Sequence, residues 1–304
     1  MTFTQRVAIV TRTKNRAILL RRAIDSVLSQ NFQEWTHVIV NDGGDPAPVD
    51  QLVDEYRTRY QDRVQVIHNP HSLGMEAASN VGINASRSEY IVIHDDDDSW
   101  KPTFLERCVA YLDDPPAALD TPIRGVITHT TRILEHLDEH GVTVKSQEPF
   151  NDWMKGVSLY RLAASNCFPP ISFVFSRSAM EEVGAFRETL PVLGDWDFHL
   201  RFAQRYEIGL IREALANYHH RLQITEGVYG NSVVAGDDKH RRYEHLYRND
   251  LLRADLQAGR IGLGYLVATA DGFERVHSQF SILETVISRL SRVRLLRWFI
   301  NKLG

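Results

Sequence analysis

The chain of 304 residues is 43% hydrophobic and 24% charged, with a formal charge of −4 at pH 7. This composition is typical of a globular protein with enough material for one large domain or two ordinary ones. The acidic balance excludes a general nucleic-acid binder, because such a protein needs a basic surface.

The first hundred residues alternate between strand and helix patterns. Short β-branched runs at 6–11, 35–41, 63–68 and 89–94 predict buried strands. Between them, apolar residues recur at spacings of three and four within 20–28, 52–60 and 75–85, which predicts helices. The alternation indicates βαβ crossovers and a mostly parallel central sheet flanked by helices, with ligands bound beyond the carboxyl ends of the strands.

The rest of the chain continues this α/β pattern less regularly. Residues 125–134 and 141–146 predict a hairpin around a polar turn, 171–176 a strand followed by a helix, and 194–206 another helix. From about residue 239 onward the pattern is helical and charged. We therefore expect one α/β unit over 1–238 and a helical extension over 239–304.

The stretch VIHDDDDSW places four carboxylates, Asp95 to Asp98, directly after the fourth predicted strand. Like charges this close repel one another, so such a cluster is a solvated loop, an acidic helix start or a cation site. Asn41 and Asp42 follow the second strand, and Thr13 and Asn15 follow the first, so three strand ends would converge on one crevice. Mg²⁺ and Mn²⁺ bind one or two carboxylates together with substrate phosphates, and such a cation would relieve the repulsion.

Longer segments carry a family resemblance over roughly residues 5–235. VAIVTRTKNRAILLRRAIDSVLSQNFQEWTHVIVNDG contains a strand, a Thr-x-Asn-Arg turn, a helix, a strand and Asp-Gly. HNPHSLGMEAASNVGINASRSEYIVIHDDDDSW adds Leu-Gly, Asn-x-Gly-Ile and Asp-x-Asp, and FVFSRSAMEEVGAFRETLPVLGDWDFHLRFA ends in an acidic motif. In this order the segments resemble the family 2 glycosyltransferases. The resemblance implies the GT-A (Rossmann-like) fold, with a nucleotide-binding half over 1–100 and an acceptor-binding half over 101–238.

The resemblance also implies roles for individual residues. Asp42 would bind a uracil-type base, Asp95 would lie near the ribose and Asp97 would bind the metal, which is Mn²⁺ or Mg²⁺. The nucleotide-binding residues implied in this way are Thr11, Thr13, Asn15, Arg16, Asp42, Gly74, Asn80, Asp95 and Asp96.

On the acceptor side, the resemblance implies that Asp195 is the general base, with Asp197 left open as the alternative. His220, in a late Tyr-x-His segment that begins at Tyr218, would reach the metal or the diphosphate. Asp98, Asp197 and Trp196 are supporting candidates.

Four positions depart from the family pattern. Gly194 stands where the family often has Glu, and Ser79 where many relatives carry Arg. Arg12 replaces a common Pro, and Lys14 a common Tyr. These departures affect the expected donor preference more than the expected fold.

The implied activity is that of an inverting, metal-dependent glycosyltransferase. Its donor would be a UDP- or dTDP-sugar, because Asp42 suits a pyrimidine, and its acceptor a hydroxyl group of a glycan or lipid-linked glycan in cell-surface polysaccharide synthesis. A sugar-phosphate nucleotidyltransferase would need a glycine-rich phosphate loop, and VTRTKNRA contains no glycine. A non-catalytic, glycosyltransferase-like binding or scaffold protein is the alternative that Gly194 keeps open.

Three further features bear on location and on competing chemistry. HLDEH, at 136–140, matches a zinc peptidase pattern, but that site needs a long helix and the flanking runs predict a hairpin. Cys108 and Cys167 form no disulfide framework, and the chain shows neither a signal peptide nor a membrane span. We therefore expect a cytoplasmic protein. The basic, amphipathic residues 289–303 favour peripheral contact with the inner face of the membrane, or with a partner.

Overall fold

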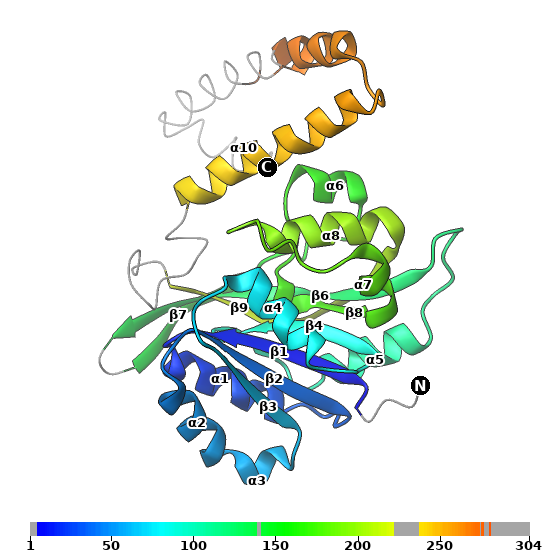
Figure 1. Cartoon of the computed structure of the whole chain (residues 1–304). Coiled ribbons are helices and arrows are strands. Elements are labelled where there is room, and N and C mark those ends of the chain that lie inside the picture. Colours follow the sequence, from blue (N-terminus) through cyan, green and yellow to red (C-terminus); the bar gives the residue numbers. More distant parts are fainter. Residues whose placement is uncertain (1–4, 139–140, 222–236, 274, 277–279, 281–304) are drawn as a thin grey trace, which may run out of the picture. The chain divides into compact units, whose positions relative to one another are not determined.

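The computed structural model of the chain describes residues 5–138, 141–221, 237–273, 275, 276 and 280 (Figure 1). Contacts divide the chain into two units, Met1–Tyr243 and Glu244–Gly304. The elements in chain order are β1 (Val7–Thr13), α1 (Ala17–Leu28), β2 (Trp35–Asp42), α2 (Pro46–Glu55), α3 (Arg57–Tyr60), β3 (Val64–Asn69), α4 (Met75–Asn84), β4 (Tyr90–Asp95), β5 (Ser99–Trp100), α5 (Phe104–Asp113), β6 (Ile123–Asp138), β7 (Gly141–Pro149), α6 (Leu159–Ala164), η1 (Pro170–Ser172), β8 (Phe173–Ser176), α7 (Arg177–Val183), α8 (Gly194–Arg205), β9 (Glu207–Arg221) and α10 (Asp237–Gln257).

The described strands form one sheet in the order β3-β2-β1-β4-β8-β6-β9-β5, with β7 attached to β6. In the first half, β1 pairs in parallel with both β2 and β4, and β2 pairs in parallel with β3. The carboxyl ends of these four strands therefore meet at one edge of the sheet. Thr13, Asp42 and Asp95 end β1, β2 and β4, so the topology brings them to that edge.

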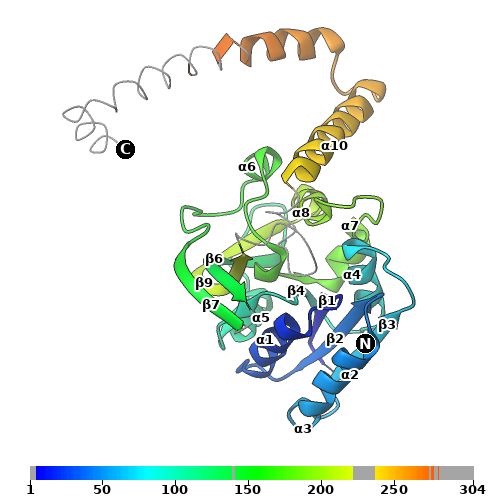
Figure 2. The same cartoon turned by 90° about the vertical axis from the view of Figure 1, so that its left-hand side faces the viewer.

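Helices cover both faces of this parallel half. α1 and α2 lie on one face, and α4, α7 and α8 lie on the other (Figures 1 and 2). Side chains alternate between the two faces along a strand, and β1 follows this rule. Ile9 belongs to the main core cluster together with Ile24 of α1, whereas Val10 faces α4, where Gly82 lets the helix backbone come close.

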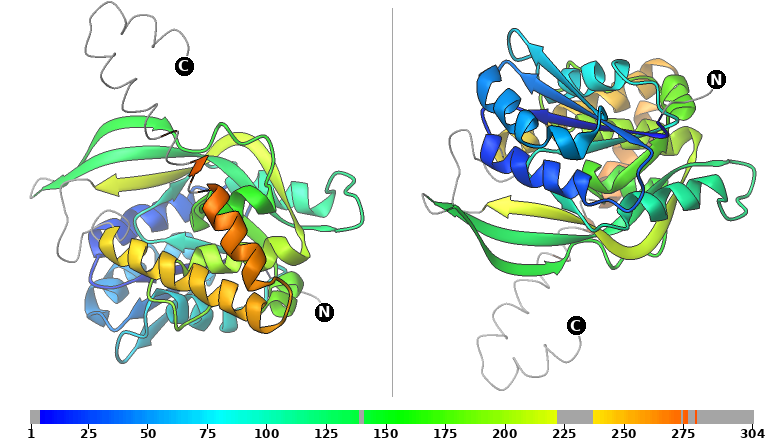
Figure 3. Two further views of the ribbon diagram at one scale, coloured as in Figure 1. Left: turned by 90° about the horizontal axis from the view of Figure 1, so that it is seen from above. Right: turned by 90° about the horizontal axis from the view of Figure 1, so that it is seen from below.

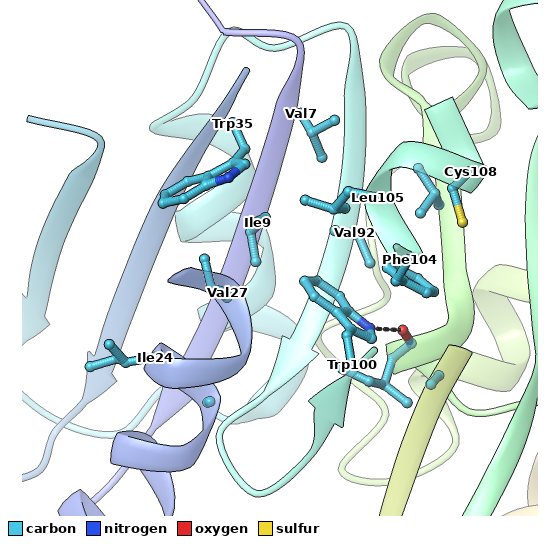
Figure 4. Packing of buried hydrophobic residues seen from close by; sticks show 14 of the residues in the cluster. Val7, Ile9, Ile24, Val27, Trp35, Val92, Trp100, Phe104, Leu105 and Cys108 are labelled. Atoms are coloured by element: carbon cyan, nitrogen blue, oxygen red, sulfur yellow. Dashed lines mark hydrogen bonds between the residues drawn. The ribbon is translucent and has the colours of Figure 1, made fainter. Parts of the chain in front are cut away.

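The main core cluster contains residues of α1, α2, α5 and the sheet (Figure 4). Trp100 connects three elements within it: its indole N–H donates to the carbonyl oxygen of Ile171 at 2.7 Å, and its ring stacks on Phe104 with centroids 4.5 Å apart. Cys108 is fully buried in the same cluster, where burial raises the pKa of its thiol. A structural role for this cysteine follows from its position.

The second half of the sheet contains a long ribbon in which β6, β7 and β9 run side by side (Figure 3). β9 pairs in parallel with β6 and antiparallel with the short β5, where Ser99 lies opposite Asn217. This pairing carries the end of β9, from Tyr218 to Arg221, to the acidic residues that precede β5. The sequence patterns did not predict β9.

Aromatic packing holds α8 against the sheet. The ring of Phe202 lies 5.2 Å from that of Phe173 and nearly perpendicular to it, and Phe198 lies 5.0 Å from Phe175. These contacts fix the first turn of α8, which contains Asp195, in relation to β8.

The four predicted strands of the first hundred residues are confirmed to within about two residues. The helix predicted over 20–28 begins earlier, at Ala17, and the helix predicted over 75–85 is confirmed as α4. The single helix predicted over 52–60 was wrong in its bounds, because the structure has two helices there, α2 from Pro46 to Glu55 and α3 from Arg57 to Tyr60. The hairpin is also confirmed, because β6 and β7 pair antiparallel on either side of residues 139–140. His136 therefore lies on a strand, which excludes the long helix that a zinc peptidase motif requires. Residues 289–303, predicted to contact a membrane or a partner, lie outside the described residues, as do 222–236.

The second unit includes most of α10, which carries the exposed ion pairs Arg248–Glu244 and Arg253–Asp250 one helical turn apart. The helical extension predicted over 239–304 stays a prediction, because residues 281–304 lie outside the described residues. Within the described part of the chain, no helix has the length and apolarity that crossing a membrane requires.

The close approach of α4 to β1 gives a first prediction. A Cβ atom in Gly82→Ala would overlap the Cγ1 of Val10 and lie 3.1 Å from Cγ2 of Val40. We expect a net loss of about 1–2 kcal/mol in urea unfolding, because overpacking outweighs the higher helix propensity of alanine. Asn84→Ala, at an exposed position of the same helix, should stay within about 0.5 kcal/mol of the wild type. A stabilising Gly82→Ala would contradict this packing.

Candidate functional site

Two adjoining cavities open at the carboxyl edge of the parallel strands. Their volumes are about 210 and 170 Å³, and both are lined by Arg12, Arg16, Met75 and Asp95. We call the first the acidic pocket; its other lining residues include Glu76, Asp97, Pro170, Leu193, Asp195 and Tyr218. We call the second the loop pocket; its other lining residues are Thr13, Lys14, Asp42, Ser72, Gly74 and Ala78.

Arginines pair with three of the four clustered aspartates. Arg12 of β1 donates to Oδ1 of Asp95 from Nη2 at 2.6 Å and from Nε at 3.0 Å. Arg16, just before α1, binds both oxygens of the fully buried Asp96, at 2.5 and 3.1 Å. Such fork-to-carboxylate pairs neutralise charge with fixed geometry.

Asp97 receives its partner from the far end of the first unit. Arg221, the last residue of β9 and fully buried, donates to Oδ2 of Asp97, and Arg16 approaches the same oxygen at 3.6 Å. Although burial acts in the opposite direction, these cations lower the pKa of Asp97 to about 2. The repulsion that we expected a metal to relieve is therefore relieved by arginines.

Glu135 of β6 binds the other side of Arg221, whose Nη1 donates to it at 3.0 Å. Glu135 also pairs with Arg22 at 2.7 Å and with His219 at 2.8 Å. Against the effect of burial, the bonds from His219 and Arg22 lower the pKa of Glu135 to about 2. The buried Asp98 accepts from the backbone N–H of His219 at 2.9 Å, and burial raises its pKa well above the usual range.

Asp42 holds the loop that forms one wall of the loop pocket. Its carboxylate accepts from the side chains of Asn69 and Ser72, and from the backbone N–H groups of Leu73 and Gly74, at 2.7–3.0 Å. Burial opposes these bonds, but together they lower the pKa of Asp42. Asp42 therefore positions residues 69–74 as well as lining the loop pocket.

Asp195 lines the acidic pocket from the start of α8 and does not line the loop pocket. Its Oδ1 accepts from the backbone N–H of Trp196, and its Oδ2 from the side-chain amide of Asn166, both at 2.8 Å. The Oδ1 of Asn166 in turn bonds Nδ1 of His199 at 3.1 Å, which fixes the orientation of the amide. Burial raises the pKa of Asp195.

The backbone leading into Asp195 is strained. Leu193, which lines the acidic pocket, adopts a left-handed conformation with φ of 67°. This conformation costs free energy for a bulky residue other than glycine, and such strain often accompanies functional sites.

Several predicted residues are engaged in internal contacts. Asp197 is fully buried and pairs with Arg201 at 2.8 Å and with Arg187 at 3.3 Å. The side-chain amide of Asn80 donates to the carbonyl oxygen of Phe186 from its nitrogen and accepts from the backbone N–H of Phe186 at its oxygen. The remaining contacts of this kind are Thr11 with His37, Asn15 with the N–H of Asp45, and Trp196 with the carbonyl of Leu162.

Asp97 and His220 offer ligands for a divalent cation. Both contacts to Asp97 described above go to Oδ2, and no described residue donates to its Oδ1. The buried Nε2 of His220 has no hydrogen-bond partner among the residues that the structure describes. Among the described residues, no three His, Cys, Asp or Glu side chains form a metal cluster. A carboxylate oxygen such as Oδ1 of Asp97 suits Mg²⁺ or Mn²⁺, which commonly complete their coordination with substrate phosphates and water.

Arg12 and Glu76 are site residues that sequence reasoning did not assign. Arg12 also donates to Ser79 at 2.9 Å and lies 3.7 Å from Glu76. The guanidinium of Arg12 thus reaches position 79 of α4, where many relatives carry an arginine. The signal was present, since Arg12 and Ser79 were both seen as departures, but only the fold brings them together.

A family model described as "Glycosyl transferase family 2" matches residues 8–184, more than half of the chain. Among curated relatives, the chain is 27% identical over 214 residues to an uncharacterized protein of Mycobacterium tuberculosis, covering 70% of this chain and 58% of that one. It is 26% identical to an uncharacterized glycosyltransferase of Methanocaldococcus jannaschii, with 66% and 65% covered. The chain thus spans only about 58% of the first of these relatives.

Solved structures of similar fold include TarS of S. aureus in complex with UDP, with a TM-score of 0.53 at 17% identity, covering 71% of this chain and 60% of that one. A mannosyltransferase of Pyrobaculum calidifontis, in complex with GDP-Man and Mn²⁺, has a TM-score of 0.55 at 17% identity, covering 86% and 66%. At these identities the likeness concerns the fold, and it confirms the expected GT-A architecture.

The pairing of Arg221 predicts a large cost for its removal. In Arg221→Met, Asp97 and Glu135 lose a shared cation, and we expect a loss of about 3 kcal/mol or more in urea unfolding. Arg132→Met, which breaks the half-exposed pair with Glu148, should cost less than about 1 kcal/mol. Equal losses in the two variants would contradict a buried, mutually dependent network.

Proposed function

This chain belongs to glycosyl transferase family 2, and on that premise we propose that it is an inverting transferase. It moves a sugar from a nucleotide-diphosphate donor to a hydroxyl group of a glycan or lipid-linked glycan acceptor. The observation that carries the proposal is the acidic pocket itself. There Asp95 and Asp97, backed by arginines, share one cavity with Asp195, which comes from a different element.

The donor occupies both cavities in this proposal. The base and ribose enter the loop pocket, between Thr13 and the loop that Asp42 holds. The family resemblance favours a pyrimidine base. The diphosphate lies beside Arg12 and Arg16, which line both cavities and are permanently charged. The sugar then points into the acidic pocket toward Asp195.

Asp97 and His220 would hold a Mn²⁺ or Mg²⁺ ion in this arrangement. When bound, the cation stabilises the negative charge that develops on the departing diphosphate. Arg221 keeps Asp97 ionised and oriented for this role.

The acceptor hydroxyl attacks the anomeric carbon from the side of Asp195. A new bond forms between the acceptor oxygen and that carbon, the bond to the diphosphate oxygen breaks, and its electron pair leaves with the nucleoside diphosphate. The hydroxyl proton passes to the carboxylate of Asp195. Asn166 and the N–H of Trp196 hold this carboxylate in place, whereas the arginine pairs of Asp197 direct that residue elsewhere.

The acceptor class rests on the family. In the synthesis of cell-surface glycans, the growing glycan that accepts the sugar is frequently linked to a lipid. The basic residues 289–303 would suit contact with an anionic membrane surface. The nucleotide sugars named with the similar structures, UDP-GlcNAc and GDP-Man, support a nucleotide-sugar donor.

Turnover of a donor panel tests the proposal. UDP-glucose, UDP-N-acetylglucosamine, dTDP-glucose and GDP-mannose are each incubated with the wild type, Mn²⁺ and a set of glycan and lipid-linked glycan acceptors, and release of nucleoside diphosphate is measured. We expect one donor class to be consumed, and Asp195→Asn to lower kcat by at least about a hundredfold because the base is lost. Affinity for the nucleoside diphosphate should be unchanged. Weakened nucleotide binding with intact turnover would remove Asp195 from this role.

The metal assignment gives a separate prediction. Asp97→Asn keeps the size of the side chain and an acceptor for Arg221, but it removes the anionic ligand. We expect Mn²⁺ to increase nucleoside diphosphate affinity in the wild type and to have little effect in this variant. The exposed Asp152→Asn serves as the control and should behave as the wild type. The same metal dependence in all three proteins would place the cation elsewhere.

A further inference from the structure

Glu76 is a buried carboxyl group for which the proposed chemistry has no role. It lies in the first turn of α4, is only 5% exposed and lines the acidic pocket. Among the described residues, none makes a hydrogen bond to its Oε2, and Nη1 of Arg12 lies 3.7 Å from that oxygen. A buried carboxyl oxygen without a hydrogen-bond partner is costly, so a partner that arrives with the substrate would be favoured.

The carboxyl group of Glu76 occupies the space beside Gly194. A Cβ atom at position 194 would lie 2.5 Å from both Cγ and Oε1 of Glu76, and closer still to its Cδ. The backbone of Gly194 is not in the left-handed region, so its conformation alone would permit a side chain. Glu76 is therefore what prevents a side chain at 194, directly before Asp195.

The charges around Glu76 come from three elements. Arg12 of β1 and Asp95 of β4 lie on the donor side, and Asp195 and Asp197 belong to α8. Burial, together with the nearby aspartates and against the effect of Arg12, raises the pKa of Glu76 to about 7. A carboxyl group in this state can donate or accept a hydrogen bond with a hydroxyl group.

We propose that Glu76 binds a hydroxyl group of the donor sugar, and that it supplies from α4 the carboxyl group that position 194 lacks. The inference rests on the proposed function, because it places the sugar between Arg12 and Asp195. It follows from the pocket lining, the unpartnered Oε2 and the shared space with Gly194. Glu76 is then a residue that determines which sugar is accepted and how it is oriented.

A space-filling role for Glu76 is the competing explanation, and paired substitutions separate the two. Glu76→Gln keeps the shape and removes the acid. Gly194→Ala alone should destabilise the protein through overlap with Glu76, and Glu76→Ala/Gly194→Ala should relieve that overlap. Glu76→Ala/Gly194→Glu returns a carboxyl group to the same space from α8.

Each variant is compared with the wild type in three measurements. These are urea unfolding, affinity for UDP with Mn²⁺, and kcat and KM for the donor with the highest turnover in the panel above. If that donor carries another nucleotide, its own nucleoside diphosphate replaces UDP. The nucleotide affinity separates a contact to the sugar from general damage to the pocket.

We expect Glu76→Gln and the Glu76→Ala/Gly194→Ala double variant to bind the nucleotide within about twofold of the wild type, with kcat/KM lowered at least about tenfold. Glu76→Ala/Gly194→Glu should recover at least a tenfold part of the activity lost in Glu76→Ala. Folded protein with restored stability but low turnover in the double alanine variant would support the inference, because space filling alone would restore both.

Wild-type turnover in Glu76→Gln, or in the double alanine variant, would overturn the inference while leaving the proposed function intact. A folded Glu76→Ala/Gly194→Glu that is no more active than Glu76→Ala would also contradict it. If the wild type consumes none of the donors, the proposed function fails first, and this inference fails with it.

Discussion

The pairing of arginines with carboxylates at the strand ends is the interaction on which the rest of the site depends. Asp96 and Asp97 are largely removed from water, and unpaired charges there would cost several kcal/mol each. The three paired cations come from the end of β1, the start of α1 and the end of β9. These ion pairs therefore connect both halves of the sheet as well as neutralising the cluster.

This arrangement leaves the two cavities with mixed charge. Arg12 and Arg16 form ion pairs with Asp95 and Asp96 and also line both cavities. Their positive charge can therefore also attract a diphosphate. Asp195 is held separately by Asn166 and the start of α8. A site that breaks a sugar–diphosphate bond needs these two environments close together, one for the leaving anion and one for the incoming hydroxyl proton.

The amino-acid sequence was sufficient to predict the parallel half of the fold and the edge where the site lies. Runs of β-branched residues indicate buried strands. The βαβ alternation brings the carboxyl ends of parallel strands together and does not depend on the individual side chains. The partners of the aspartates were not predictable in this way, since Arg221 is separated from Asp97 by 124 positions and lies on a strand without a clear pattern. The contact of Glu76 with Gly194 depends on how α4 packs near α8. The spacing of apolar residues along the sequence predicts each helix but not this packing. The only signal was the absence of a side chain at Gly194, and its meaning emerged from the packing.

The most direct test of this account is calorimetric titration of the wild type with UDP, dTDP, GDP and CMP, each with and without Mn²⁺. The account predicts that one nucleoside diphosphate, with a pyrimidine base, binds clearly more tightly than the others and that Mn²⁺ strengthens its binding. Failure of all four nucleotides to bind, with or without the metal, would contradict the claim that these strand ends form a nucleotide-sugar site.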